Sequence, residues 1–142
     1  MGEEIFRISR DKTRAKDLVE MANERMTDII TIIPKDKAYK ILEEYYEVLV
    51  QLMTAIMYAD GYKTISHISL IKYIEKNNKE LSKPEIFLID QIRKFRHGTV
   101  YYGKKISDGF LINNKELLTS IISKLFKIAK NKINWKISIF IY

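Results

Sequence analysis

Residues 37–60 read KAYKILEEYYEVLVQLMTAIMYAD, and apolar side chains recur in this stretch every three or four positions. That period is typical of an amphipathic helix with a broad apolar face. Gly61 follows directly and is the expected left-handed residue after the last turn, and Asp36 is the expected N-cap. The stretch therefore predicts a long helix with one buried face.

Helical periodicity continues on both sides of this stretch. Residues 3–31 predict a first long helix, which Pro34 ends, and residues 66–77 predict a short helix. The chain contains only two prolines and five glycines, and they separate the periodic segments. This punctuation indicates helices joined by short loops.

Two capping boxes mark the expected starts of the remaining helices. Ser82 and Glu85 flank a proline that favours a first helical turn, and Asn113 and Glu116 repeat the spacing before a last apolar stripe. Four long helices and one short helix predict an all-α fold, an up-and-down bundle that forms one domain over residues 1–131.

The C-terminal residues 132–142 depart from the helical pattern. Isoleucines and Trp135 alternate there with polar residues, which is the period of a strand. One strand has no pairing partner within a helical bundle. The segment is therefore interpreted as a dimer arm, as an extension of the last helix or as a disordered tail.

The composition excludes several kinds of site. The chain has no cysteine, so disulfides, thiolate zinc sites and cysteine nucleophiles are excluded, and a reducing compartment is favoured. No signal peptide and no apolar run long enough to span a membrane is visible. We therefore expect a soluble, cytoplasmic protein with no membrane partner.

The net charge of +7 is unevenly distributed along the chain. Residues 117–142 contain five lysines and no acid, so residues 1–116 carry 20 basic against 18 acidic residues, a net charge of only +2. A cationic last helix favours RNA or another polyanion, and Lys124 and Lys127 are candidate phosphate contacts. The alternative is a solvated helix face.

The strongest candidate site is residues 93–103, which read RKFRHGTVYYG near the end of the fourth helix. Arg93 and Arg96 are candidates to bind phosphate, since two guanidinium groups can clamp one anion. Arg96, His97 and Tyr101 are the catalytic candidates, with His97 as the general acid or base, and Tyr102 is a candidate RNA contact. The alternative is a capped helix end, where cations favour the helix dipole.

Other polar groups give weaker signals. His67 is interpreted as a partly buried histidine at a helix start, because no further ligand at a supportive spacing indicates a metal. Glu43, Glu44 and Glu47 are interpreted as a solvated helix face. No metal and no cofactor is predicted, and the glycine-rich nucleotide motifs and the serine-hydrolase motif do not occur.

Taken together, several short motifs resemble those of HEPN domains, which are small helical bundles of prokaryotes. The resemblance covers about residues 4–130. It rests on Tyr45-Tyr46-Glu47, on Ala55 and Ala59, on Asp60-Gly61-Tyr62-Lys63, on Ser66-His67 and on Arg93-x-x-Arg96-His97-x-x-x-Tyr101-Tyr102-Gly103.

This resemblance implies a four- or five-helix bundle that forms a homodimer, with the motif helices meeting across the two-fold axis. Many members are metal-independent endoribonucleases. Some are toxins paired with a small nucleotidyltransferase partner protein, and others are inactive versions that bind RNA or a partner.

The catalytic signature of the family is an arginine, often followed by asparagine, aspartate or histidine, and then a histidine after a gap of roughly four to six residues. Arg96 followed by His97 matches the opening of that signature, but Tyr101 or Tyr102 occupies the place of the second histidine. A phenol with a pKa near 10 is a poor base at neutral pH. The favoured function is therefore binding of RNA, a nucleotide or a partner protein in a toxin–antitoxin or defence setting. An active endoribonuclease that uses His97 is the first alternative, and a pure protein-interaction module is the second.

Overall fold

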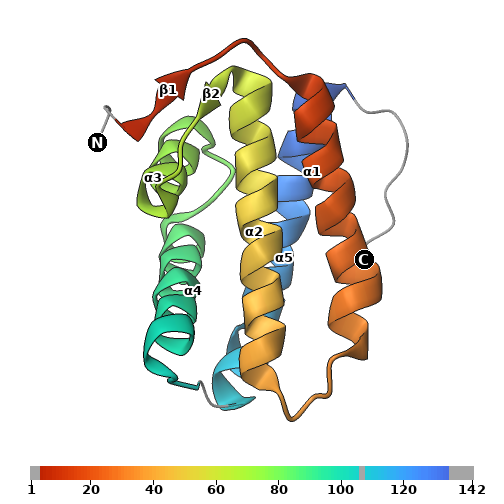
Figure 1. Ribbon diagram of the computed structural model, residues 1–142, viewed down its shortest axis with the longest axis vertical. Helices are drawn as coiled ribbons and strands as arrows, with labels where there is room; N and C mark the ends of the chain where they lie inside the picture. Colours follow the sequence, from red (N-terminus) through yellow and green to blue (C-terminus); the bar gives the residue numbers. More distant parts are fainter. Residues whose placement is uncertain (1–3, 106–107, 135–142) are drawn as a thin grey trace.

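Helix α2 (Ala38–Asp60) is the element around which the other helices pack. The structure, a computed structural model, describes residues 4–105 and 108–134. Figure 1 shows α2 between α1 and α4, with α5 behind it. The helix buries a continuous stripe of large side chains, among them Tyr46, Leu49, Leu52, Met53, Ile56 and Met57. This confirms the helix predicted for residues 37–60.

The first helix is shorter than predicted. Helix α1 (Lys12–Glu24) continues as a π-helical turn η2 (Arg25–Ile29) and a 3₁₀ turn η3 (Ile30–Ile32). The side chain of Asp11 accepts a hydrogen bond from the backbone N–H of Arg14 at 2.9 Å and caps the start of α1. The helix predicted from residue 3 is therefore wrong for the residues before this cap.

Those preceding residues pair with a segment that follows α2. Strand β1 (Phe6–Arg7) pairs antiparallel with β2 (Tyr62–Lys63). Gly61, which links α2 to β2, adopts the left-handed conformation with φ 95°, as predicted. Its carbonyl accepts a hydrogen bond from the N–H of Ile8 at 2.9 Å. A Cβ atom at this glycine would lie 3.1 Å from the Ile8 carbonyl oxygen. The turn therefore requires glycine both for its dihedral angle and for its close approach.

Helices α3 (His67–Asn77) and α4 (Lys83–Tyr102) begin where the sequence predicted. Ser66 caps α3 by accepting from the N–H of Ser69 at 3.1 Å. At α4, both hydrogen bonds of the capping box between Ser82 and Glu85 are present. The predicted N-cap of α2 is wrong, because Lys37 and not Asp36 occupies that position and makes no side-chain capping bond.

Helix α5 (Asp108–Ile133) begins before the predicted capping box. Asn113 and Glu116 lie inside the helix, so that predicted start is wrong. The ring of Phe110, in the first turn, packs edge-on against Phe95 of α4 at 4.7 Å between centroids, which gives the early turn a tertiary contact.

The helix reaches Ile133, so the first two residues of the predicted tail are helical, and the strand-like pattern from Trp135 onward lies outside the described residues.

The fold is thus all-α, with one two-stranded pairing, and its described elements form a helical bundle. None of the helices among the described residues is both long and apolar enough to cross a membrane.

Candidate functional site

The cluster predicted at residues 93–103 lies almost entirely on α4, which runs unbroken to Tyr102 and ends at Gly103 in the left-handed conformation with φ 67°. Successive residues of a helix are rotated by about 100°. Arg96 and His97 are therefore neighbours in sequence that face different surroundings, and the site has two sides.

The first side faces α2 and α3 and contains both arginines. Nε of Arg93 donates to Oδ1 of Asp90 at 2.8 Å, within the same helix, and the arginine side chain is 21% exposed. Burial alone would raise the pKa of Asp90, but the hydrogen bond and the charge of Arg93, with a further contribution from Lys94, lower it. Arg93 is thus held in place by a carboxylate of its own helix.

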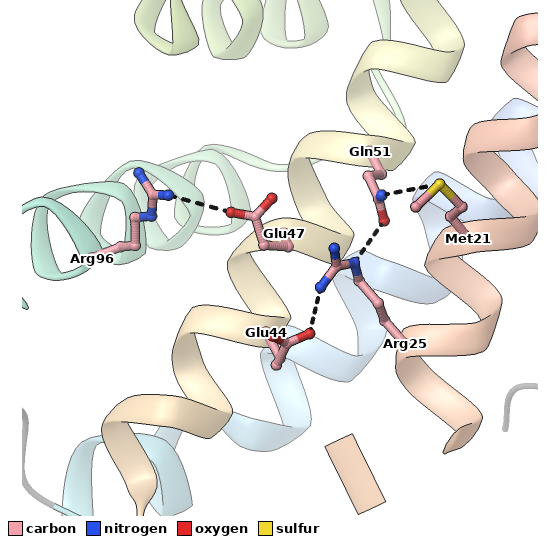
Figure 2. A network of polar contacts seen from close by, with 6 residues as sticks. All are labelled: Met21, Arg25, Glu44, Glu47, Gln51 and Arg96. Atoms are coloured by element: carbon pink, nitrogen blue, oxygen red, sulfur yellow. Dashed lines mark hydrogen bonds and ion pairs between the residues drawn. The ribbon is translucent and has the colours of Figure 1, made fainter. Parts of the chain in front are cut away.

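Arg96 crosses from α4 to α2. Its Nη2 lies 3.4 Å from Oε2 of Glu47, as Figure 2 shows, and its Cζ lies 5.8 Å from the ring centroid of Tyr46. The Arg96 and Glu47 side chains are 31% and 34% exposed, so this ion pair is accessible to solvent. Within the described part of the chain, Glu47 is the only hydrogen-bonding partner of Arg96.

A second arginine binds the same polar face of α2 from the opposite direction. Arg25 donates to Oε1 of Glu44 at 2.6 Å and to Oε1 of Gln51 at 3.1 Å (Figure 2). Glu44 and Glu47, which were interpreted as part of a solvated helix face, are only partly exposed and pair with arginines from neighbouring elements. Periodicity alone identifies a polar face but not what packs on it.

His67 joins this first side through Tyr46. The phenol oxygen of the fully buried Tyr46 lies 2.8 Å from Nδ1 of His67, and the ring centroids are 5.6 Å apart. Burial, then the positive charge of Arg96, lowers the pKa of His67, and burial raises the pKa of Tyr46 to about 12. Both groups are therefore neutral at neutral pH.

The sequence interpretation of His67 as a histidine at a helix start is correct in position. That interpretation did not predict that His67, and not His97, lies beside Arg93 and Arg96. The signal that points to the group is the occurrence of both Tyr46 and His67 among the motifs that resemble HEPN domains.

The second side of the site contains His97 and the two tyrosines. The ring of the exposed His97 lies 4.7 Å from that of Tyr101 and 5.8 Å from that of Tyr102, measured between centroids. Tyr101 is 65% exposed and Tyr102 70% exposed. Both tyrosines were expected to lie near His97, and the structure places all three at the end of α4.

An open cavity of about 700 Å³ adjoins the rings of His97 and Tyr102. The backbone N–H of Lys104 donates to the carbonyl of Gly98 at 3.2 Å and closes the C-terminal cap of α4. The cavity lining combines cations and aromatic rings: Lys94, Phe95, His97, Gly98, Tyr102, Lys104, Lys105 and Phe110. Cations beside accessible aromatic rings are the chemistry that binds single-stranded nucleic acid.

The two lysines predicted on the last helix do not join either side. Nζ of Lys124 donates to Oε1 of Glu85 at 2.9 Å and to the carbonyl of Glu80 at 3.1 Å, near the start of α4. His97 lies twelve residues beyond Glu85, about 18 Å along the helix. Lys127 is exposed on α5, one turn further from the cluster than Lys124.

Lys124 has a structural partner. Although burial alone would raise the pKa of Glu85, hydrogen bonds from the backbone and side chain of Ser82 and from Lys124 lower it. Lys124 therefore neutralises a carboxylate that is 3% exposed, so its charge is committed to a contact within the chain.

Comparison with known proteins adds no relative: the chain matches no protein-family model and no curated protein sequence. Over residues 4–105 and 108–134, no group of three or more histidines and acids is arranged to hold a metal ion.

Proposed function

We propose that this chain is a HEPN-like, up-and-down helical bundle that binds single-stranded RNA at the C-terminal end of α4. The observation that carries the proposal is the open cavity where His97 and Tyr102 meet the lysines of the following loop. Two exposed tyrosines on one helix end, beside four cationic or titratable side chains, form a surface suited to an anionic aromatic ligand.

Each part of this surface has a role that follows from its chemistry. Tyr101 and Tyr102 offer rings on which unpaired bases can stack, which contributes about 1–3 kcal/mol per base. Lys94, Lys104 and Lys105 are exposed, so they can neutralise phosphates and release counterions. Single-stranded RNA fits better than a duplex, because stacking requires bases that are already unpaired.

Binding is favoured over cleavage because the parts needed for proton transfer are separated. Arg96 faces Glu47 and Tyr46, whereas His97 faces Tyr101 on the other side of α4. An endoribonuclease needs its base and its phosphate-binding cation on one phosphodiester. We therefore expect a single-stranded RNA incubated with the protein in EDTA to be bound but to stay intact.

The test is fluorescence anisotropy with a labelled single-stranded RNA at low salt. Tyr102→Ala should weaken binding by about tenfold, since it removes one stacking ring. Tyr102→Phe is the matched control and should bind within about twofold of the wild type, because it keeps the ring. Equal loss in both variants, or no loss in either, would contradict stacking on this tyrosine.

A second candidate function, protein binding, is favoured by the face that α3 and α4 share. Phe87 is 68% exposed and Ile68 is 48% exposed. An open groove of about 630 Å³ lies between the two helices, and its lining includes Ile68 and Phe87. The groove also carries charges of both signs, Lys72, Glu75 and Lys83, so two copies related by a two-fold axis can pair opposite charges.

The proposed occupant of this face is a second copy of the chain, in line with the homodimer that the HEPN resemblance implies. Sedimentation equilibrium should show a dimer, and Phe87→Glu should shift it to monomer. A monomer at every concentration would contradict the proposal. The small nucleotidyltransferase partner and the toxin–antitoxin setting stay predictions from the resemblance, and a gene for such a partner beside this one would support them.

A further inference from the structure

The junction of α2, α3 and α4 presents hydrogen-bond donors that the RNA-binding end of α4 does not use. Tyr46 of α2 lies at its centre. Its hydroxyl contacts His67 at 2.8 Å, and the Arg96 guanidinium lies 5.8 Å from its ring. His67 and Arg96 come from different helices, but both adjoin Tyr46, and Arg96 lies near enough for its charge to lower the pKa of His67.

The hydrogen bond between Tyr46 and His67 determines which imidazole nitrogen carries the proton. A buried hydroxyl has to donate its hydrogen, and among the described residues Tyr46 Oη has His67 as its only hydrogen-bond partner. The phenol therefore donates and Nδ1 accepts. In a neutral imidazole the other nitrogen then bears the hydrogen, so Nε2 of His67 is a donor.

This Nε2–H group is left without a partner by the described residues. His67 as a whole is partly buried, not enclosed. Among the described residues, the buried side-chain nitrogen or oxygen without a hydrogen-bond partner is Oδ1 of Asn23, and His67 Nε2 is not one of these buried atoms. The same reasoning applies to the nitrogens of Arg96 that do not contact Glu47.

We infer that His67 is a neutral hydrogen-bond donor of a phosphate site that it shares with Arg96 and Arg93. The inference rests on the proposed RNA binding, and it names where a phosphate is gripped beside the stacking surface. Two acids face the same junction, Glu47 from α2 and Asp90 from α4. A phosphate would compete with Glu47 for Arg96, whose contact at 3.4 Å is long for an ion pair with a hydrogen bond.

On this reading His67 cannot act as the base of a ribonuclease, because its Nε2 atom already carries a hydrogen. The role is that of a donor to a phosphate oxygen, strengthened by the guanidinium charges beside it. This gives the site a histidine without giving it cleavage activity.

Two isosteric substitutions separate the two nitrogens of the ring. His67→Gln places an amide N–H near the position of Nε2 but loses the partner of Tyr46. His67→Asn keeps an oxygen that can accept from Tyr46 but has no donor at the position of Nε2. Each variant thus keeps one of the two hydrogen-bonding positions of the histidine. A loss of affinity in only one of them is therefore not explained by misfolding of any variant at this position.

The experiment measures the affinity for a single-stranded RNA by anisotropy and the stability by urea unfolding for both variants. We expect His67→Asn to lose about tenfold in affinity with little loss of stability, since a hydrogen bond to a charged group is lost. We expect His67→Gln to bind within about threefold of the wild type but to unfold at lower urea. Unchanged affinity in both variants, while Tyr102→Ala weakens binding, would overturn the inference and leave the RNA proposal standing.

If the wild type binds no RNA even at low salt, the RNA proposal fails, and inorganic phosphate decides the inference. In a ¹⁵N-labelled sample, phosphate should shift the Nε2 resonance of His67, and Arg96→Ala should abolish that shift. Phosphate binding without RNA binding would identify a free phosphate as the ligand. No shift of Nε2 at any phosphate concentration would overturn the inference.

Discussion

The two histidines of this chain lie in surroundings that their positions in the sequence do not reveal. His97 is adjacent to Arg96 in the sequence but lies with Tyr101 and Tyr102, exposed at the mouth of an open cavity. His67 comes thirty residues earlier, at the start of α3, and bonds to Tyr46, the ring on which Arg96 lies. One helical step of about 100° separates residues 96 and 97, whereas tertiary packing unites residues 67 and 96.

The difference shows that adjacency in the sequence of a helix does not predict which residues share a site. Only residues three or four apart share a helix face, and a site between helices depends on how those helices pack. In our account the α4 end beyond His97 stacks bases, and the junction at His67 donates to a phosphate. Each of the following predictions separates these two regions.

The largest effect is expected from Arg96→Ala, which removes the cation beside His67. We expect RNA affinity to fall between ten- and a hundredfold, because a charge-assisted contact to phosphate is lost. Arg25→Ala is the matched control: it also removes one positive charge and one ion pair with a glutamate of α2, but Arg25 approaches that helix from the α1 side and not from α4 (Figure 2). Anisotropy with the same RNA measures both.

Equal losses in the two variants would mean that only the net charge matters. That outcome would remove the reason to place a phosphate at the junction.

The next effect concerns the lysines around His97. Lys94→Gln combined with Lys104→Gln should weaken RNA binding by about tenfold at low salt. The slope of log affinity against log salt should become shallower by about 1.4, since each phosphate contact on a single strand contributes about 0.7. Lys79→Gln removes an exposed charge from the loop between α3 and α4 and should leave the slope unchanged.

A salt slope that is unaffected by the double substitution would place the phosphate contacts elsewhere on the protein.

A moderate effect is expected from Tyr46→Phe, which removes only the hydroxyl that orients His67. The free energy of unfolding should fall by about 1 kcal/mol, as for the loss of one buried hydrogen bond. Because the imidazole hydrogen is then free to occupy either nitrogen, RNA affinity should fall by about two- to threefold. Nitrogen chemical shifts of His67 should show one tautomer in the wild type and a mixture in the variant.

Finding the same tautomer in both proteins would show that Tyr46 does not determine which nitrogen of the His67 ring carries the hydrogen.

The smallest effect is the pH dependence of stability. The folded-state pKa of His67 is lowered by burial and by Arg96, more than Glu47 raises it, with Arg93 acting in the same direction as Arg96. The unfolded chain therefore binds a proton first, so stability should fall as the pH drops below about 6.5 and level off below the folded-state pKa. Urea unfolding at several pH values should show this fall in the wild type.

His67→Gln should lack that part of the pH dependence, whereas His97→Gln should retain it. A fall of equal size in all three proteins would mean that His67 does not contribute to it.

Much of the fold could be predicted because its signals are local. The apolar stripe of α2, the left-handed Gly61 and the capping box of Ser82 with Glu85 all depend on residues within a few positions of each other. The errors occurred where tertiary contacts override local patterns. β1 has two residues and therefore no period to detect, and α5 starts early, where Phe110 packs on Phe95.

The sequence was sufficient to name residues of the candidate site on α4, but not to predict which residues of other helices lie beside them. All five residues named near the end of the fourth helix lie on α4. The acids that pair with Arg93 and Arg96, and the histidine that adjoins them, could not be predicted, because they depend on which faces of α2 and α3 meet α4. Lys124 shows the same limit, since its partner Glu85 lies 39 positions away.

The most direct test of RNA binding at the end of α4 is photochemical cross-linking. A single-stranded RNA that carries 4-thiouridine is irradiated with the protein, and the cross-linked tryptic peptides are identified by mass spectrometry. We predict that the main adduct lies on the peptide that follows Arg96 and ends at Lys104, within which Tyr101 and Tyr102 lie. Cross-links that instead concentrate on α5 around Lys127, with none on that peptide, would contradict the account.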